Sequence, residues 1–154
     1  MIHLHRLHRT QRLPIPIPTA WEFFSDPRNL VRITPPDLDF VITSGLERSM
    51  HPGQIITYTI RPLMGVRRRW VTEITHVDPP HLFVDEQRFG PYRFWHHLHR
   101  FVEVEGGVEM TDTVHYLIGI PLIDPLIDRF VVRPRLEGIF DFRKLALEGI
   151  FGGG

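Results

Sequence analysis

The chain has 154 residues, a length typical of one domain, and it contains no cysteine, which excludes disulfide bonds, thiolate metal sites and cysteine nucleophiles. Basic and acidic residues number 18 each, so no net charge draws the protein toward nucleic acid or an anionic membrane. The sequence contains neither an apolar run of about 18 residues, which a membrane-spanning helix needs, nor a secretory signal. We expect a cytoplasmic protein with one domain over residues 1–150 and a flexible tail over residues 151–154.

The N-terminal part of the chain predicts one strand followed by two short helices. Apolar and polar residues alternate roughly from Ile2 to Gln11, which is typical of a strand, and the prolines that follow end it. Thr19 is then expected to cap a helix over residues 20–24, with Glu22 three residues later as in a capping box. A proline ends that helix, and residues 29–33 predict a second short helical segment.

The middle of the chain alternates with period two, the spacing of side chains on one face of a strand. Six strands are predicted over residues 38–44, 53–60, 69–77, 82–88, 92–104 and 108–118. Turn residues separate them, including a hairpin signal at Gly106-Gly107. Since no helix intervenes, neighbouring strands are expected to pair antiparallel. With the first strand they predict a curved sheet of about seven strands.

The C-terminal part changes to helical spacing from Ile123 to about Leu147. The predicted apolar face comprises Leu126, Phe130, Ile139, Phe140 and Leu147, and the residues largely off it are Asp128, Arg129, Arg135, Glu137 and Lys144. Pro134 must kink or split the helix, because proline removes a backbone hydrogen bond. This helix is the one large partner for the sheet. We therefore predict an α+β helix-grip fold, in which the curved sheet wraps the long helix and leaves a pocket for a small molecule.

The order of these elements and several local motifs resemble the SRPBCC superfamily, which includes START-type lipid carriers, birch-pollen-allergen-like proteins and polyketide cyclases. The matching segments span nearly the whole chain and read FFSDPRNL (23–30), ITPP (33–36), FVDEQ (83–87), GPY (90–92), WHHLHRF (95–101) and MTDTV (110–114). More narrowly, the chain resembles an uncharacterised bacterial group, some members of which are fused to a nucleotide-sugar-epimerase-like domain. The resemblance implies a helix-grip fold but no particular catalytic residues, because this fold carries lipids, cyclises polyketides, hydrolyses or simply binds.

The strand predicted over residues 92–104 and its two neighbours carry the candidate site. The aromatic-bearing faces of the three strands show Trp95, His97, His99 and Phe101; Phe83, Asp85 and Gln87; and Asp112, Val114 and Tyr116. Burying the aromatic rings is most favourable, so we assign these faces to the concave side, where buried charges need partners. Aromatic residues of earlier strands would supply flat walls. The candidate ligand-binding residues are Tyr58, Trp70, Asp85, Gln87, Trp95, His97, His99, Asp112 and Tyr116.

Other interpretations of these residues stay open. The polar network can be purely structural, with each aspartate holding a histidine in one tautomer, and the opposite face assignment would expose His97 and His99. The two histidines with a nearby aspartate also suit a divalent metal, although the spacing fixes no third ligand, and we assign neither a metal nor another cofactor. The same pair suits general acid–base catalysis with Asp85 or Asp112, as in a cyclase or hydrolase.

Three functions are therefore compatible with the sequence. The favoured function is binding or carrying a small hydrophobic molecule, such as a lipid, quinone or polyketide, in an internal pocket with a polar patch. A cyclase- or hydrolase-type enzyme is the first alternative. A macromolecule-interaction module is the second, and it predicts a filled cavity and a large exposed apolar patch. The expected partner is a small hydrophobic ligand, with no nucleic acid and no integral membrane segment.

Overall fold

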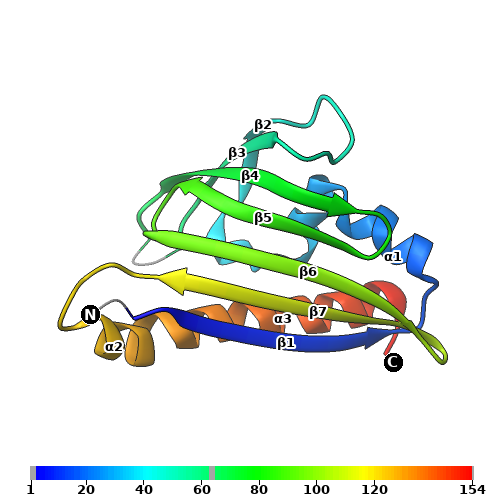
Figure 1. Ribbon diagram of the computed structural model, residues 1–154. Helices are drawn as coiled ribbons and strands as arrows, with labels where there is room; N and C mark the ends of the chain where they lie inside the picture. The colour runs from blue at the N-terminus through cyan, green and yellow to red at the C-terminus, as the bar shows by residue number, and fades with distance from the viewer. Residues whose placement is uncertain (1–2, 63–64, 154) are drawn as a thin grey trace.

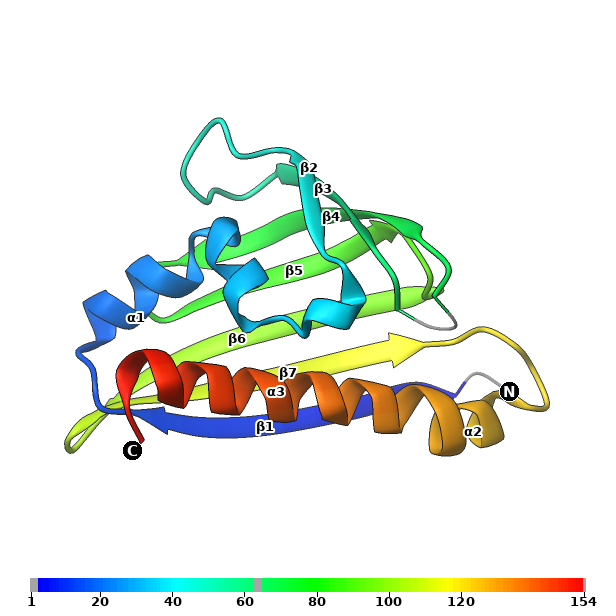
Figure 2. The same cartoon turned by 180° about the vertical axis from the view of Figure 1, so that it is seen from behind.

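A curved sheet of seven antiparallel strands packs against a long C-terminal helix (Figure 1, Figure 2). The computed structural model describes residues 3–62 and 65–153, so Ile2 of the predicted first strand lies outside the described residues. The strands are β1 (His5–Leu13), β2 (Val41–Ser44), β3 (Gln54–Ile60), β4 (Arg68–Asp78), β5 (Leu82–Phe89), β6 (Phe94–Val104) and β7 (Gly107–Leu117). Their order across the sheet is β1-β7-β6-β5-β4-β3-β2. The predicted α+β helix-grip fold is confirmed.

Short helices follow β1 and lie on the same side of the sheet as the long helix (Figure 2). They are α1 (Ile17–Phe24), η1 (Pro27–Ile33) and η2 (Pro36–Leu38). The predicted capping box was wrong, because α1 begins at Ile17 and Thr19 lies inside it. Pro16 occupies the N-cap position and makes no side-chain cap. Pro18, in the first turn, fixes a helical backbone angle and leaves one N–H fewer to be capped. This accounts for the start of α1 before Thr19.

The strand boundaries follow the prediction closely except at β2. Leu38 belongs to η2, and β2 begins only at Val41, because the left-handed backbone of Asp39 (φ 46°) interrupts an extended conformation. The predicted hairpin joins β6 to β7, with Val104 paired to Gly107.

The curvature of the sheet has an identifiable cause in β4. The pairing of β4 with β5 shifts register between Val71 and Thr72 and again between Ile74 and His76. Such bulges bend a strand and increase its twist. The sheet therefore curls around the helices, which leaves space between its concave face and α3.

The C-terminal helix consists of three consecutive parts. They are α2 (Asp124–Ile127), a single π-helical segment η3 (Asp128–Val132) and α3 (Arg133–Phe151). Pro134 lies in the first turn of α3, directly after the π-helical segment, where the missing N–H is tolerated. Phe151 belongs to the helix instead of the predicted flexible tail, because its ring packs on Phe23 at 5.0 Å between centroids. Among the described residues, no helix is both long and apolar enough to cross a bilayer.

The predicted apolar face of the long helix was wrong at its N-terminal end. Leu126 and Phe130 are 59% and 67% exposed, whereas Asp128 is buried. A π-helical turn contains more residues than an α-helical turn, so it rotates the preceding residues relative to those of α3. The buried residues of α3 are Leu136, Phe140, Arg143 and Leu147.

The buried Asp128 fastens the start of the helix to the sheet. Its carboxylate accepts hydrogen bonds from the Tyr116 hydroxyl of β7 and from Arg133. The neighbouring Asp124 pairs with His5 of β1 and accepts a hydrogen bond from the backbone N–H of Gly119. Hydrogen bonds to a buried carboxylate are stronger than those between neutral groups. These contacts explain why a carboxylate occupies a position that the helical spacing assigned to solvent.

Removing the Tyr116 hydroxyl tests this attachment. We expect Tyr116→Phe to lower the free energy of unfolding by about 1.5–3 kcal/mol, because a buried carboxylate loses a hydrogen-bond donor. Urea denaturation measures the change. Tyr92→Phe is the matched control, since no hydrogen bond of its hydroxyl to the described residues is present, and its effect should be smaller. Equal losses in the two variants would show that the bond to Asp128 contributes nothing specific.

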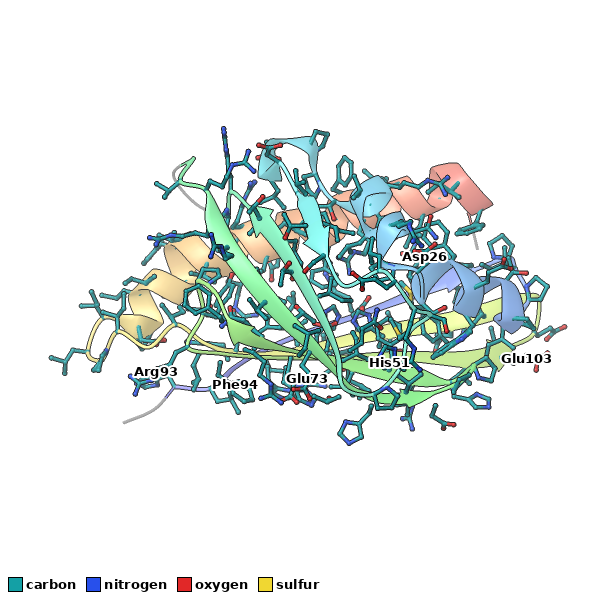
Figure 3. All side chains as sticks on the ribbon, turned by 90° about the horizontal axis from the view of Figure 1, so that it is seen from above. Asp26, His51, Glu73, Arg93, Phe94 and Glu103 are labelled. Carbon is teal, nitrogen blue, oxygen red and sulfur yellow. The ribbon has the colours of Figure 1, made fainter. Side chains whose placement is uncertain are left out.

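Two apolar clusters fill the ends of the space under the sheet, and β6 runs from one to the other. Trp95 belongs to the cluster around Trp70 and Phe140, and Phe101 belongs to the cluster around Phe83. His97 and His99 lie between them on the same face of β6. On the opposite, outer face of the sheet lie Glu73 and Phe94, as Figure 3 shows.

Candidate functional site

A cavity of about 180 Å³ lies between the concave face of the sheet and the helices. Its walls are mainly apolar and come from the strands β2 to β7 and from the helical segments α1, η1, η2 and α3. Aromatic and aliphatic side chains of the walls include Phe40, Ile56, Tyr58, Trp70, Ile74, Phe83, Trp95, Leu136 and Phe140. Cavities of this kind, with a few convergent polar groups, are the usual sites of small-molecule binding.

The structure brings seven of the nine candidate residues to this cavity. They are Tyr58, Trp70, Asp85, Trp95, His97, His99 and Asp112. The sheet face that the sequence left open is thereby defined, since His97 and His99 face the helix and are only 5% and 9% exposed. Alternation along three paired strands is sufficient to gather these side chains, because period two directs every second residue to one face.

Gln87 and Tyr116 are not among the residues that line the cavity. The side-chain amide of Gln87 bonds to the backbone N–H and C=O of Tyr92, and so closes the turn between β5 and β6. Tyr116 is fully buried and donates its hydroxyl hydrogen to Asp128. Both residues lie toward the end of the sheet where that turn and the start of the long helix meet. The alternation of side chains along the strands assigned Gln87 and Tyr116 to the concave face. It could not predict which part of each strand lines the cavity.

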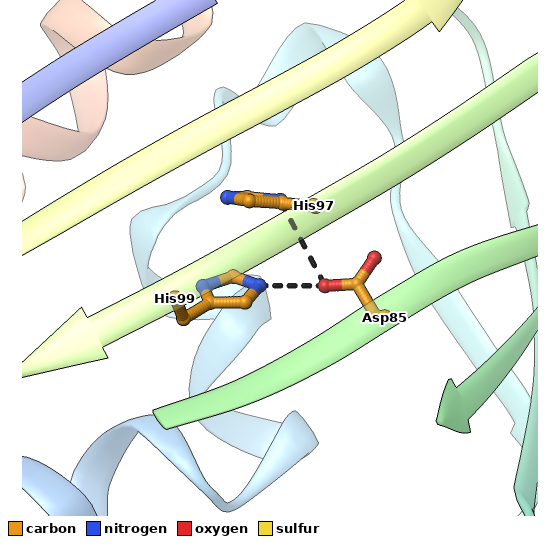
Figure 4. Close-up of side chains that lie close together, drawn as sticks. All are labelled: Asp85, His97 and His99. Atoms are coloured by element: carbon orange, nitrogen blue, oxygen red, sulfur yellow. Dashed lines mark hydrogen bonds and ion pairs between the residues drawn. The ribbon is translucent and has the colours of Figure 1, made fainter. Parts of the chain in front are cut away.

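The polar part of the cavity is a pair of stacked histidine rings between the carboxylates of Asp85 and Asp112. Figure 4 shows the two rings with Asp85. The ring centroids of His97 and His99 are 3.7 Å apart. Asp85 on β5 pairs in register with His97, and Asp112 on β7 pairs with His99. Each carboxylate therefore lies beside one edge of both rings. His99 also stacks on Phe83 at 4.1 Å, which fixes the stack against the apolar wall.

The contacts of the two rings favour different protonation states. His99 forms a hydrogen bond from Nε2 to Oδ2 of Asp85 at 2.6 Å, and its Nδ1 lies 3.1 Å from Oδ1 of Asp112, within ion-pair distance. A carboxylate only accepts, so an imidazolium at His99 satisfies both contacts. His97 donates from Nε2 to Asp112 at 2.7 Å, but its Nδ1 lies 3.8 Å from Oδ2 of Asp85, beyond hydrogen-bond distance. His97 is therefore the neutral partner, with a lone pair on Nδ1.

The electrostatic environment supports this assignment. Burial alone would lower the pKa of His99, but hydrogen bonds to Asp112 and Asp85 outweigh it and raise that pKa above its ordinary value. Burial and the adjacent charge of His99 lower the pKa of His97. Burial also opposes ionisation of Asp85 and Asp112, yet the two histidines hold the pKa of each carboxyl below its usual range. The buried group thus contains two anions and one imidazolium.

Arg143 of α3 is a cavity residue that the sequence analysis missed. It is buried, lines the cavity and places its guanidinium carbon 4.7 Å from the centroid of the Phe140 ring. Among the described residues, Asp85 and Asp112 form their ion pairs with the histidines. The Nε atom of Arg143 is buried and has no hydrogen-bond partner in the described part of the chain. With Arg143 included, the charges of this buried cluster sum to zero.

A sequence signal for Arg143 did exist. Leu136, Phe140, Arg143 and Leu147 follow the spacing of one buried stripe along a helix. An arginine inside such a stripe must bury its charge, so it indicates either a partner or a polar cavity.

The arrangement also bears on metal binding. One ligand atom from each of Asp85, His97 and His99 lies within 4.8 Å of the others, a separation that a metal site permits. A metal ion binds an imidazole nitrogen at about 2.0–2.1 Å along its lone pair, which lies in the ring plane. Two rings stacked 3.7 Å apart at an interplanar angle of 26° do not direct both lone pairs at one point. The hydrogen bonds to the two carboxylates account for the geometry more simply.

The fold and the cavity between its sheet and helices define a helix-grip protein. No protein-family model matches the sequence, and no curated protein is significantly similar to it. Among solved structures, protein Ms6760 from Mycobacterium smegmatis is 21% identical with a TM-score of 0.67, over 94% of this chain and 92% of its own. Ara h 8.0201 is 17% identical with a TM-score of 0.65, over 96% of this chain and 99% of its own. These similarities show the fold.

A third structure places the same fold inside a longer protein. The nucleoside-diphosphate sugar epimerase from Corynebacterium glutamicum is 20% identical with a TM-score of 0.61. The match covers 92% of this chain but only 28% of that protein. A domain with this fold is therefore one part of that epimerase, as the resemblance implied for some relatives.

Proposed function

We propose that the protein binds a small hydrophobic molecule with one polar group in its internal cavity. The observation that carries this proposal is the lining of the cavity, where apolar and aromatic walls surround a single buried polar cluster. An apolar cavity of about 150 Å³ is enough to bind benzene, so the present cavity accommodates at least a ring-sized group. Such a molecule would bury its apolar surface against Trp70 and Ile56 and direct its polar group toward His97.

Two further observations favour a bound molecule over an interaction module without a pocket function. The cavity is not filled by side chains, whereas an interaction module without a pocket function requires a packed interior. The indole Nε1 of Trp70 is buried and finds no hydrogen-bond partner within residues 3–62 and 65–153, although Trp70 lines the cavity. A buried donor without a partner is costly, and an acceptor on a bound molecule would satisfy it.

The proposal is tested first on the protein as purified. Native mass spectrometry followed by denaturation would release and identify a bound molecule or metal. A co-purified hydrophobic compound would support the proposal and reveal its chemical class. A retained metal that is lost in His97→Ala would instead favour the enzyme alternative.

A cavity-filling variant provides a quantitative test. We expect Ile56→Trp to weaken binding of the neutral fluorescent probe N-phenyl-1-naphthylamine by at least about tenfold, because the indole occupies the space that the probe needs. Ile56 lines the cavity, whereas its neighbour Ile55 is 44% exposed on the other face of β3. Ile55→Trp is therefore the matched control and should bind the probe as the wild type does. Unchanged binding in Ile56→Trp would place the probe outside the cavity.

A further inference from the structure

Besides the Trp70 indole, two polar groups of the cavity have hydrogen-bonding capacity that the described residues do not use. Nδ1 of His97 carries a lone pair, because Nε2 of the same ring donates to Asp112. The nearest carboxylate oxygen to Nδ1, on Asp85, lies 3.8 Å away and is itself an acceptor. Arg143 contributes a buried Nε without a partner on a cationic side chain. One cavity therefore presents an unused base and an incompletely paired cation.

Both groups lie beside the same aromatic ring of the cavity wall. The His97 ring lies 5.9 Å from the Phe140 ring, edge to face, and the Arg143 guanidinium lies 4.7 Å from the same ring. All three side chains line the cavity. A ligand that packs against Phe140 would thus have a hydrogen-bond acceptor from the sheet and a cationic donor from the helix on the walls around it.

We propose that the ligand carries an acidic hydroxyl group of the phenol or enol type, which gives its proton to Nδ1 of His97 while its oxygen accepts hydrogen bonds from Arg143. This inference rests on the proposed function, and it specifies the chemical class of the polar group. In the transfer, the ligand O–H bond breaks, its electron pair stays on oxygen, and an N–H bond forms at Nδ1. Asp112 holds the ring in the tautomer that exposes Nδ1 as the base.

The charges around His97 favour a hydroxyl group over a permanent anion. The charged groups of this cluster are Asp85 from β5, His99 from β6, Asp112 from β7 and, in the same cavity, Arg143 from α3. Two of these are anions and two are cations, so the cluster is neutral before binding. Proton transfer from a neutral hydroxyl adds one positive and one negative charge, which preserves neutrality. A ligand carboxylate would add a buried negative charge unless a proton were also taken from water. Burying that additional charge costs binding energy.

The second positive charge on the histidine stack is tolerable for a geometric reason. Each of the two rings has a carboxylate oxygen at both edges, with separations between 2.6 and 3.8 Å. Two imidazolium rings would therefore face two carboxylates. The Tyr58 hydroxyl lines the same cavity but is no competing acid, because burial raises its pKa further above the ordinary value.

The test uses a nitrophenol with a short alkyl chain and its methyl ether, because nitrophenol and nitrophenolate have distinct absorption spectra. Titrations are made at a pH about one unit below the pKa of the free probe, where roughly a tenth of it is ionised. Bound to the wild type, the phenol should show the nitrophenolate spectrum. It should also bind at least about tenfold more tightly than the ether.

Two variants test which residues cause the ionisation of the bound phenol and its preference over the ether. In His97→Gln the amide nitrogen replaces the Nε2 donor to Asp112 but supplies no base, and in Arg143→Met the side chain keeps an unbranched apolar stem but loses the cation. Both should bind the phenol in its neutral form, with the preference over the ether reduced to near one. His96→Gln, a change on the other face of β6, should retain the ionised spectrum.

The outcomes separate this inference from the function on which it rests. Binding of both probes by the wild type with equal affinity, or binding of the phenol without ionisation, would overturn the inference and leave the proposed function standing. Ionisation that persists in His97→Gln would also overturn it. If the wild type binds neither probe, the proposed function itself fails.

Discussion

Asp112→Asn is expected to lower the free energy of unfolding by about 3–5 kcal/mol at pH 7, the cost of breaking a buried ion pair by removing one partner. Asp112 is 3% exposed and contacts the edges of both histidine rings. An asparagine keeps the shape but removes the charge that balances the His99 imidazolium. Since Asp85 alone cannot neutralise both His99 and Arg143, a buried positive charge would remain. Urea denaturation measures this loss.

The loss of stability in Asp112→Asn should depend on pH in a defined direction. The folded-state pKa of Asp112 is depressed, so its contribution is present above the unfolded pKa of about 3.9 and disappears as pH falls toward the folded value. The difference in stability between wild type and Asp112→Asn should therefore shrink below pH 4. Glu109→Gln is the matched control on β7, because Glu109 pairs with the exposed Arg12. That change should cost less than about 1 kcal/mol. Equal costs for the two variants would contradict a buried ionic role for Asp112.

The residues of the site also show what the sequence can specify. Alternation in β5, β6 and β7 predicts which residues share a face, and the burial of aromatic rings predicts which face is concave. That reasoning places Asp85, His97, His99 and Asp112 together before any coordinates are known. It cannot give the order of contacts within the group, because those depend on the strand register, which only the paired sheet defines.

The features that escaped prediction have local physical causes. Thr19 carries the chemistry of a helix cap, but the prolines before it start α1 earlier. Phe130 was assigned to the buried face because uniform α-helical spacing was assumed, and the π-helical segment breaks that spacing. Arg143 was overlooked because charged residues are ordinarily placed at the surface. In each case a specific backbone feature or cavity outweighs a general residue preference.

His99→Gln is expected to produce a loss of similar size, about 3–5 kcal/mol near neutral pH, because two buried carboxylates would lose the cation that lies between them. The folded-state pKa of His99 is raised above its unfolded value of about 6.5. Its contribution is therefore fully present below pH 6.5 and is lost as pH rises through the folded pKa. The wild type should lose up to about 1.4 kcal/mol per pH unit over that range. The variant should lack this alkaline decline.

The titration of His97 should change the stability with pH in the direction opposite to that of His99. Its folded pKa is lowered, so the unfolded chain takes up a proton that the folded chain does not, and this term reduces stability as pH falls below about 6.5. Urea denaturation from mildly acidic to alkaline pH measures the stability, and NMR of the histidine ring resonances follows each titration. Together they separate the contributions of His97 and His99. His96→Gln on the outer face of β6 is the control and should leave stability within about 0.5 kcal/mol. A neutral His99 at pH 7, with no alkaline decline, would mean that Arg143 alone balances the carboxylates. The two carboxylates, the two histidines and Arg143 would then carry one net negative charge in total. That charge would hinder the formation of a ligand oxyanion beside them.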